Sequence, residues 1–152
     1  MKILYICRGG VFRSRIAQAL TNRYLVGVMP QSSGIEADKN YSGRISAHCE
    51  FLLKKHNMIK LTQDNWIQTT QSLINKSDLS IFLSQDVYDD SLKIFDINGN
   101  HEIWNIEDIN IKEMNEIYKY ESVLNEIFEN IKENVLDLKN NRTDIGGALF
   151  NN

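Results

Sequence analysis

The chain has 152 residues, with 17 lysines and arginines against 20 aspartates and glutamates, and a formal net charge of -3 at pH 7. Because the sequence pI is about 5.6, we expect neither nucleic acid nor an anionic membrane as a partner. The hydrophobic fraction of 42% is typical of one ordinary globular domain, and no apolar run is long enough for an export signal or a membrane span.

Strand-like and helix-like segments alternate along the first third of the chain. Residues 3–6 form a short apolar run that predicts a buried strand. A helical pattern follows, with apolar residues three and four positions apart at Ile16, Ala17, Leu20 and Tyr24. Residues 28–32 predict a second strand, and residues 44–55 a second helix.

The alternation continues to the end of the chain. Thr62 is predicted to cap a helix that runs to about residue 77. Residues 79–83 predict a strand, 86–95 a short helix and 103–106 a fourth strand. A long amphipathic helix closes the domain, with one apolar face formed by Met114, Ile117, Leu124, Ile127, Ile131, Val135 and Leu138.

This order of elements predicts an α/β fold with a parallel sheet and helices on both faces. Sheets of this kind bind ligands at the carboxyl ends of their strands. We expect one domain over residues 1–139, and a loosely ordered tail over the asparagine-rich residues 140–152.

The loop after the first strand has the sequence CRGGVFRS and suits phosphate chemistry. A loop that opens a helix presents backbone N–H groups to an anion, and Gly9 and Gly10 permit the positive φ angles that such a loop needs. Arg13 offers a planar fork for two phosphate oxygens. In this surrounding Cys7 is favoured as the nucleophilic thiolate, and Ser14 can donate a hydrogen bond to the sulfur.

A cysteine at a strand end is often only a small buried side chain, and a Cys-x5-Arg spacing also occurs by chance. The placement of Cys7 between an N-terminal strand and a helix favours the catalytic interpretation. The second cysteine, Cys49, shares a helical face with Ile45 and Leu52, which favours a structural role. Two cysteines form neither a disulfide scaffold nor a four-cysteine zinc site, and they indicate a reducing cytoplasm.

The segment CRGGVFRSRIAQAL after the strand ILYI resembles the signature of the low-molecular-weight protein-tyrosine phosphatase family, which includes the thioredoxin-coupled arsenate reductases. Three further segments, SSG, SDLSIFLSQD and WNIED, are similar to family segments, so the resemblance covers about residues 2–138. It implies a three-layer αβα fold with a four-stranded parallel sheet in the order 2-1-3-4.

The resemblance also implies a mechanism without metal or cofactor. Cys7 would attack phosphorus and form a cysteinyl-phosphate, Arg13 would bind the phosphate, and Ser14 would stabilise the thiolate. Asp108 would act as acid and then as base, with Glu107 as the adjacent substitute. The implied substrate-binding residues are Arg8, Gly9, Gly10, Val11, Phe12, Ser32 and Tyr41.

Several positions depart from the family pattern. Ile109 stands where the family has proline after its acid, which leaves that loop less constrained. Gly10 replaces an asparagine that ties the loop to a serine, so Ser32 lacks its expected partner. Arg8 replaces an uncharged residue, and either favours a substrate with extra negative charge or has no role. Tyr41 is either an aromatic wall of the site or a surface residue.

Two groups of residues are assigned no chemistry. Asp86, Asp89 and Asp90 are interpreted as helix-capping and solvated carboxylates. No metal-ligand spacing joins the three histidines, which are His48, His56 and His101.

The predicted function is hydrolysis of phosphomonoesters, with protein phosphotyrosine as the leading substrate. The alternatives are a small-metabolite phosphatase, an arsenate reductase-like protein and a weakly catalytic phosphate-binding module. Arsenate reduction needs further cysteines after the third strand, and residues 84–100 contain none. We expect a phosphorylated protein or a small phosphomonoester as the partner, and a monomer or weak dimer.

Overall fold

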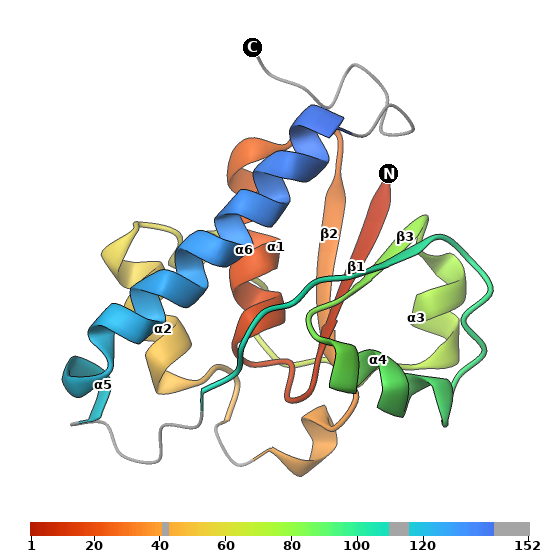
Figure 1. Ribbon diagram of the computed structural model, residues 1–152, viewed down its shortest axis with the longest axis horizontal. Helices are drawn as coiled ribbons and strands as arrows, with labels where there is room; N and C mark the ends of the chain where they lie inside the picture. Colours follow the sequence, from red (N-terminus) through yellow and green to blue (C-terminus); the bar gives the residue numbers. More distant parts are fainter. Residues whose placement is uncertain (41–42, 110–115, 142–152) are drawn as a thin grey trace.

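The computed structural model describes residues 1–40, 43–109 and 116–141, and it has a parallel sheet at its centre (Figure 1). Four strands pair in the order β2-β1-β3-β4, and all three pairings are parallel. Their bounds are Lys2–Cys7 for β1, Met29–Gly34 for β2, Leu79–Phe82 for β3 and His101–Ile103 for β4. The predicted fold class and strand order are confirmed.

Helices cover both faces of the sheet, which gives three layers. α1, α2 and α6 lie on one face, and α3 and α4 lie on the other (Figure 1). Their bounds are Arg13–Tyr24 for α1, Ala47–Lys55 for α2, Gln71–Lys76 for α3, Gln85–Leu92 for α4, Glu116–Lys119 for α5 and Glu121–Asn141 for α6. Two short 3-10 turns lie at Ala37–Lys39 and Ile59–Leu61.

β1 is buried on both faces, as its apolar sequence predicts. Tyr5 belongs to the larger apolar cluster under α1 and α6, whereas Leu4 and Ile6 belong to the smaller cluster under α3 and α4. The Tyr5 hydroxyl lies 2.6 Å from the Thr21 hydroxyl of α1, so the buried phenol has a hydrogen-bond partner. The strand that carries the candidate nucleophile is therefore fixed from both sides.

The helix predicted from Thr62 to residue 77 is wrong over its first half. The chain forms no regular helix at residues 62–70, and α3 begins only at Gln71, after the cap residue Thr70. Polar side chains explain the difference, because the Thr62 hydroxyl accepts a hydrogen bond from buried Arg15. The Gln63 carbonyl accepts a second hydrogen bond from the same guanidinium. These bonds hold residues 62 and 63 against α1, and the backbone at Thr62 is extended.

Two other predicted elements are displaced. The fourth strand is shifted toward the N-terminus, because the ladder with β3 forms at His101–Ile103. Beyond it, Trp104 and Ile106 donate backbone hydrogen bonds to Phe82 and Leu83, and the chain turns toward the end of β1. The predicted second helix begins at Ala47, where the Ser46 hydroxyl accepts the N–H of Cys49 and caps the helix.

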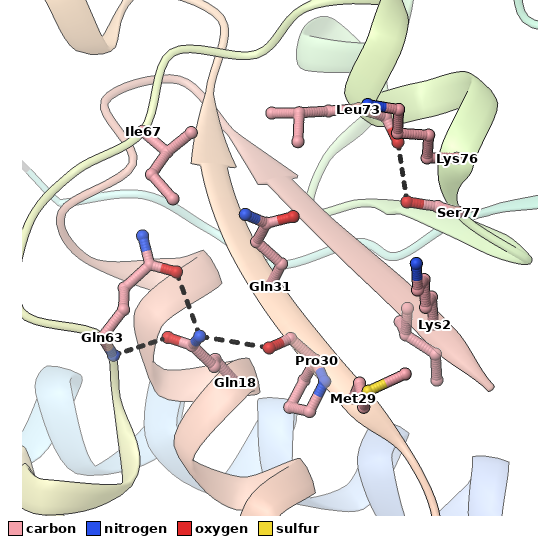
Figure 2. Close-up of a pocket in the computed structure, with 11 residues that line it drawn as sticks. Lys2, Gln18, Met29, Pro30, Gln31, Gln63, Ile67, Leu73, Lys76 and Ser77 are labelled. Carbon is pink, nitrogen blue, oxygen red and sulfur yellow. Dashed lines mark hydrogen bonds between the residues drawn. The ribbon is translucent and has the colours of Figure 1, made fainter.

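The outer edge of β2 is covered by side chains and not by another strand. The Gln63 side-chain amide accepts the N–H of Ser32 at 3.1 Å and donates to the Ser32 carbonyl at 3.0 Å. Gln18 links Gln63 to the carbonyl of Pro30 (Figure 2). The N–H of Gly34 donates to the Ile67 carbonyl, and the Gly34 carbonyl accepts the N–H of Thr69. The outward-facing backbone groups of β2 from residue 30 to residue 34 therefore all have hydrogen-bond partners.

A pocket of about 430 Å³ lies beside this edge, between β2 and α3 (Figure 2). Lys2 and Met29 line it, so it is at the amino end of the sheet. The carboxyl ends of the strands, where the fold class predicts a ligand, are at the opposite end.

Three predictions concern residues outside the described part of the chain: Tyr41, Met114 and most of the tail from residue 140. The other predicted members of the closing helical face are buried, although the chain forms two helices, α5 and α6, and not one. None of the helices described is both long and apolar enough to cross a membrane.

Candidate active site

Cys7 is the last residue of β1, and α1 begins at Arg13, so the loop between them lies at the carboxyl end of the sheet. The Cys7 side chain is 2% exposed. Its Sγ lies 3.0 Å from the Ser14 hydroxyl and accepts the N–H of Gly10 at 3.2 Å. The Ser14 hydroxyl and the Gly10 N–H therefore converge on the sulfur.

In the loop backbone, carbonyl groups accept hydrogen bonds from neighbouring segments, whereas several N–H groups remain available to a ligand. The carbonyls of Arg8, Gly9 and Val11 accept hydrogen bonds from Glu36, Asn40 and Ser46. Within the described residues, no acceptor is bonded to the N–H groups of Arg8, Gly9, Val11 and Phe12. Free amides at the start of a helix are the donors that bind a phosphate.

Glycines allow this loop to pack directly against the end of β2. Gly10 has a φ of 67°, whereas Gly9 does not have the positive φ that the sequence predicts. Gly34 is required for another reason, because a Cβ there would lie 2.4 Å from the Gly10 nitrogen. The loop and β2 thus touch backbone to backbone.

Ser32 has a partner that the sequence did not predict. Its hydroxyl donates to the Ser14 hydroxyl at 2.6 Å, although Gly10 offers it no side chain. Because the Ser14 oxygen accepts this bond, its own proton is available for Cys7 Sγ. The two serines form a buried relay that ends at the candidate nucleophile.

Arg13 is 3% exposed and lies between the loop and the chain after β4. Its guanidinium donates to the Ile106 carbonyl at 3.0 Å and pairs with the Asp108 carboxylate at 3.3 Å. The N–H of Ile109 donates to the other oxygen of Asp108 at 2.9 Å, a bond that a proline at this position has no N–H to make. Arg13 and Asp108 are therefore brought together, and the isoleucine contributes to the placement of the carboxylate.

Arg8 makes three ion pairs on the opposite side of the loop. Its guanidinium lies 2.9 Å from Asp86, 2.8 Å from Asp90 and 3.6 Å from Glu36. Burial disfavours its charge, but the hydrogen bonds to Asp86 and Asp90 outweigh burial and raise the pKa of Arg8. The interpretation of these two aspartates as only capping and solvated groups is therefore wrong.

Val11 and Phe12 are buried, with 8% and 5% of their surface exposed. The Phe12 ring contacts His48 edge to face at 4.4 Å between ring centroids. Burial lowers the pKa of His48, and the charge of Asp108 opposes that shift. Because the side chains of Val11 and Phe12 are buried, these residues can bind a phosphate only through their backbone N–H groups.

Cys49 lies on α2 with none of its surface exposed. Its thiol donates to the Phe12 carbonyl at 3.7 Å, and burial raises the pKa of the thiol. Both cysteines are free. In the parts of the chain that the structure describes, no three histidine, cysteine, aspartate or glutamate side chains gather as a metal ion would require.

Three contributors to this site were missed from the sequence: Gly34, Asn40 and the Asp86–Asp90 pair. The aspartates are four residues apart on α4, which follows a strand adjacent to β1. This spacing on a helix next to the loop could have indicated that the two aspartates pair with Arg8. Gly34 lies in the SSG segment that resembles the family, but its close contact with the loop is not visible from the sequence. Asn40 carries no such signal, because its bond is to the Gly9 carbonyl, which is distant in sequence.

By sequence, the chain matches no family model and no curated protein. By structure, it is similar to Vibrio vulnificus Wzb in complex with benzylphosphonate, with a TM-score of 0.71 and 18% identity over 89% of this chain and 94% of that one. It is also similar to a low-molecular-weight phosphotyrosine phosphatase from Vibrio cholerae, with a TM-score of 0.72 and 13% identity over 93% and 97% of the two chains.

An arsenate reductase from Archaeoglobus fulgidus has the same fold, with a TM-score of 0.62 and 20% identity over 88% of this chain and 98% of that one. The chain therefore has the fold shared by low-molecular-weight protein-tyrosine phosphatases and arsenate reductases, in agreement with the resemblance found in the sequence.

Proposed function

We propose that the protein hydrolyses phosphate monoesters, with phosphotyrosine on proteins as the leading substrate, through a phosphate ester of Cys7. The observation that carries this proposal is the placement of the Cys7 sulfur in a loop whose N–H groups at Arg8, Gly9, Val11 and Phe12 are bonded to no acceptor among the described residues, with Arg13 at the start of the helix that follows. A nucleophile and preorganised donors for the transferred phosphoryl group are the two requirements of this chemistry. The likeness of the fold to phosphatases supports the same function.

In the first step, loop N–H groups and Arg13 bind the phosphate. Because Arg13 is paired with Asp108 in the free protein, the phosphate takes the place of that carboxylate on the guanidinium. The Cys7 thiolate then attacks phosphorus, and an S–P bond forms as the P–O bond to the leaving group breaks. Asp108, displaced from Arg13, takes up a proton from the solvent or from the substrate monoanion and gives it to the leaving oxygen.

In the second step, the Asp108 carboxylate takes a proton from water, and the water oxygen attacks phosphorus. The S–P bond breaks, inorganic phosphate leaves and the thiolate is restored. The Ser14 hydroxyl, oriented by Ser32, stabilises the sulfur as it regains its charge. This cycle needs a reduced Cys7, which is consistent with a reducing cytoplasm.

Hydrolysis explains the site better than arsenate reduction. Reduction requires a second thiol to attack the modified Cys7 sulfur. Cys49, the other cysteine of the chain, is fully buried with a raised pKa, and its thiol is bonded to a carbonyl. A resolving thiol must instead be accessible and readily deprotonated.

The first test is hydrolysis of p-nitrophenyl phosphate by the purified protein in the presence of EDTA. We expect turnover, inhibition by vanadate, and loss of turnover in Cys7→Ser while phosphate binding is retained. Wild-type turnover in Cys7→Ser would contradict the assignment of the nucleophile. Phosphate binding without turnover in the wild type would leave the binding module as the function.

The second test concerns the acid. Asp108→Asn should lower kcat by about 10² to 10⁴ with phenyl phosphate, whose leaving group needs a proton, and by much less with p-nitrophenyl phosphate. Glu107→Gln is the matched control and should keep the wild-type ratio of the two rates. The reverse result would assign the acid to Glu107.

A further inference from the structure

The border of the proposed phosphate site on the side of α4 is acidic. We call it the α4 rim, and it consists of Arg8, Glu36, Asp86 and Asp90. Arg8 directly follows Cys7 in the loop, and its guanidinium contacts all three carboxylates. Lys93 pairs with Asp90 at 3.2 Å, so three carboxylates face two cations and one net negative charge is left.

The carboxylates of the rim are more exposed than its central cation. The Arg8 side chain is 31% exposed, whereas Asp86 is 66%, Glu36 is 42% and Asp90 is 39% exposed. A substrate that approaches the loop therefore meets carboxylates before it meets the guanidinium. Arg8 is not a free cation for a second anionic group.

The rim is close enough to the phosphate site to act on a substrate held there. The pKa of Asp86 falls to about 2 because Ser84 and Arg8 favour its carboxylate, and the more distant charge of Arg13 adds to the effect. The chain itself places the rim beside the phosphate site, because Arg8, which contacts Asp86 and Asp90, directly follows Cys7 in the loop. Bonds to Arg8 and Lys93 lower the pKa of Asp90 as well, and both aspartates are ionised at neutral pH.

From this arrangement we infer that the site selects phosphorylated substrates that carry a basic group near the phosphate. The inference rests on the proposed function and specifies its substrate class as phosphotyrosine in a lysine- or arginine-rich segment. Phosphate itself binds to the loop amides and Arg13, while the neighbouring basic side chain is attracted by the α4 rim. Substrates with several anionic groups, such as sugar bisphosphates, are disfavoured by the same charge.

The experiment compares two phosphotyrosine peptides of equal length, one with lysines and one with glutamates beside the phosphotyrosine. At low ionic strength we expect kcat/KM to be about fivefold higher for the lysine peptide, as a Coulomb interaction of one or two charges across a solvated rim gives. At about 0.5 M salt the preference should largely disappear, because the screening length is then only about 4 Å.

The double variant D86N/D90N supplies the decisive comparison. It leaves Glu36 against Arg8 and Lys93, so the net charge of the rim becomes positive and the glutamate peptide should become the better substrate. Asp86→Asn alone, a change at an exposed side chain, should remove most of the lysine preference and serves if the double variant does not fold. The matched control is Asp89→Asn, since Asp89 lies on the same helix but is bonded to Gln85, and it should keep the wild-type preference.

Hydrolysis of p-nitrophenyl phosphate separates the two proposals. If that compound is hydrolysed but the peptides have equal kcat/KM, or if the preference survives in D86N/D90N, the inference about the rim is wrong and the proposed function stands. If nothing is hydrolysed, the proposed function fails. The affinities of Cys7→Ser for the two peptides then decide the inference without turnover, and equal affinities would overturn it.

Discussion

Gly34 shows how closely a single atom is constrained at the site. A Cβ on this residue would lie 2.4 Å from the Gly10 nitrogen and 2.5 Å from the Gly9 carbonyl carbon, both backbone atoms that cannot rotate away. We expect Gly34→Ala to lower the free energy of unfolding by about 2 to 4 kcal/mol and to weaken phosphate binding. Urea unfolding and phosphate titration measure both effects.

The control for that substitution is Gly99→Ala. A Cβ at Gly99 meets no atom within 4 Å, so the change in the free energy of unfolding should stay within about 0.5 kcal/mol. Equal effects of the two substitutions would contradict the explanation that Gly34 is needed for the close backbone contact.

His48 makes the stability of the fold depend on pH. Burial lowers the pKa of His48 in the folded protein, so as the pH falls below about 6.5 the unfolded chain binds a proton at His48 at a higher pH than the folded protein does. Stability contributed by neutral His48 is therefore present at higher pH and is lost as the solution becomes more acidic. The wild type should lose more stability than His48→Leu between about pH 7.5 and 5.5, measured by urea unfolding. Parallel curves for the two proteins would refute this assignment.

At the residue scale, the sequence predicts local groups well and distant partners poorly. Cys7, Arg13 and Ser14 could be proposed together from the sequence because one short segment carries all three, and their roles remain predictions. Two of the three carboxylates that pair with Arg8 lie 78 and 82 positions along the chain, and only the fold brings them to the loop. For the same reason, the Ser14 hydroxyl was not predicted as the partner of Ser32.

At the scale of elements, α6 is predicted well because its apolar face repeats over several turns. Ile131 has no exposed surface and packs in the larger cluster. Replacing it with alanine should lower the free energy of unfolding by about 2 to 4 kcal/mol, since the side chain is removed from a filled core. Glu133→Ala, on the exposed side of the same helix, should change it by less than about 0.5 kcal/mol.

Residues 62–70 were predicted wrongly because their conformation is fixed by distant contacts. Arg15 is 1% exposed and donates to Thr62, to the Gln63 carbonyl and to the Arg44 carbonyl. Leaving the buried Arg15 guanidinium without hydrogen-bond acceptors would cost more free energy than a helix in this segment would gain. A method that considers only neighbours in sequence does not detect this constraint.

At the scale of the whole molecule, the Arg8 ion pairs join the first strand-helix loop to α4. The pKa of Asp86 is depressed to about 2, so its contribution to stability is present above its ordinary pKa near 4 and is lost as the pH falls through 2. The stability difference between the wild type and Asp86→Asn should be less than about 1 kcal/mol at pH 5 and should vanish near pH 2, because Asp86 is well exposed. A difference that persists near pH 2 would contradict the ion-pair explanation.

The covered edge of β2 also matters for the molecule as a whole. Gln63→Ala would leave the N–H and carbonyl of Ser32 without their partner and open the strand to pairing with another chain. We expect this variant to self-associate at concentrations where the wild type does not, which sedimentation velocity measures. The control is Gln71→Ala, since the Gln71 amide donates to the Asp96 carbonyl and makes no bond to β2.

The Gln63 amide that covers this edge can be converted into a carboxylate by deamidation. Deamidation converts Gln63 into glutamate, whose carboxylate accepts hydrogen bonds but has no N–H for the Ser32 carbonyl. One spontaneous reaction would thus remove half of the edge protection and add a negative charge. Gln63→Glu reproduces the deamidated side chain, so this variant should self-associate at concentrations where the wild type does not, as sedimentation velocity would measure.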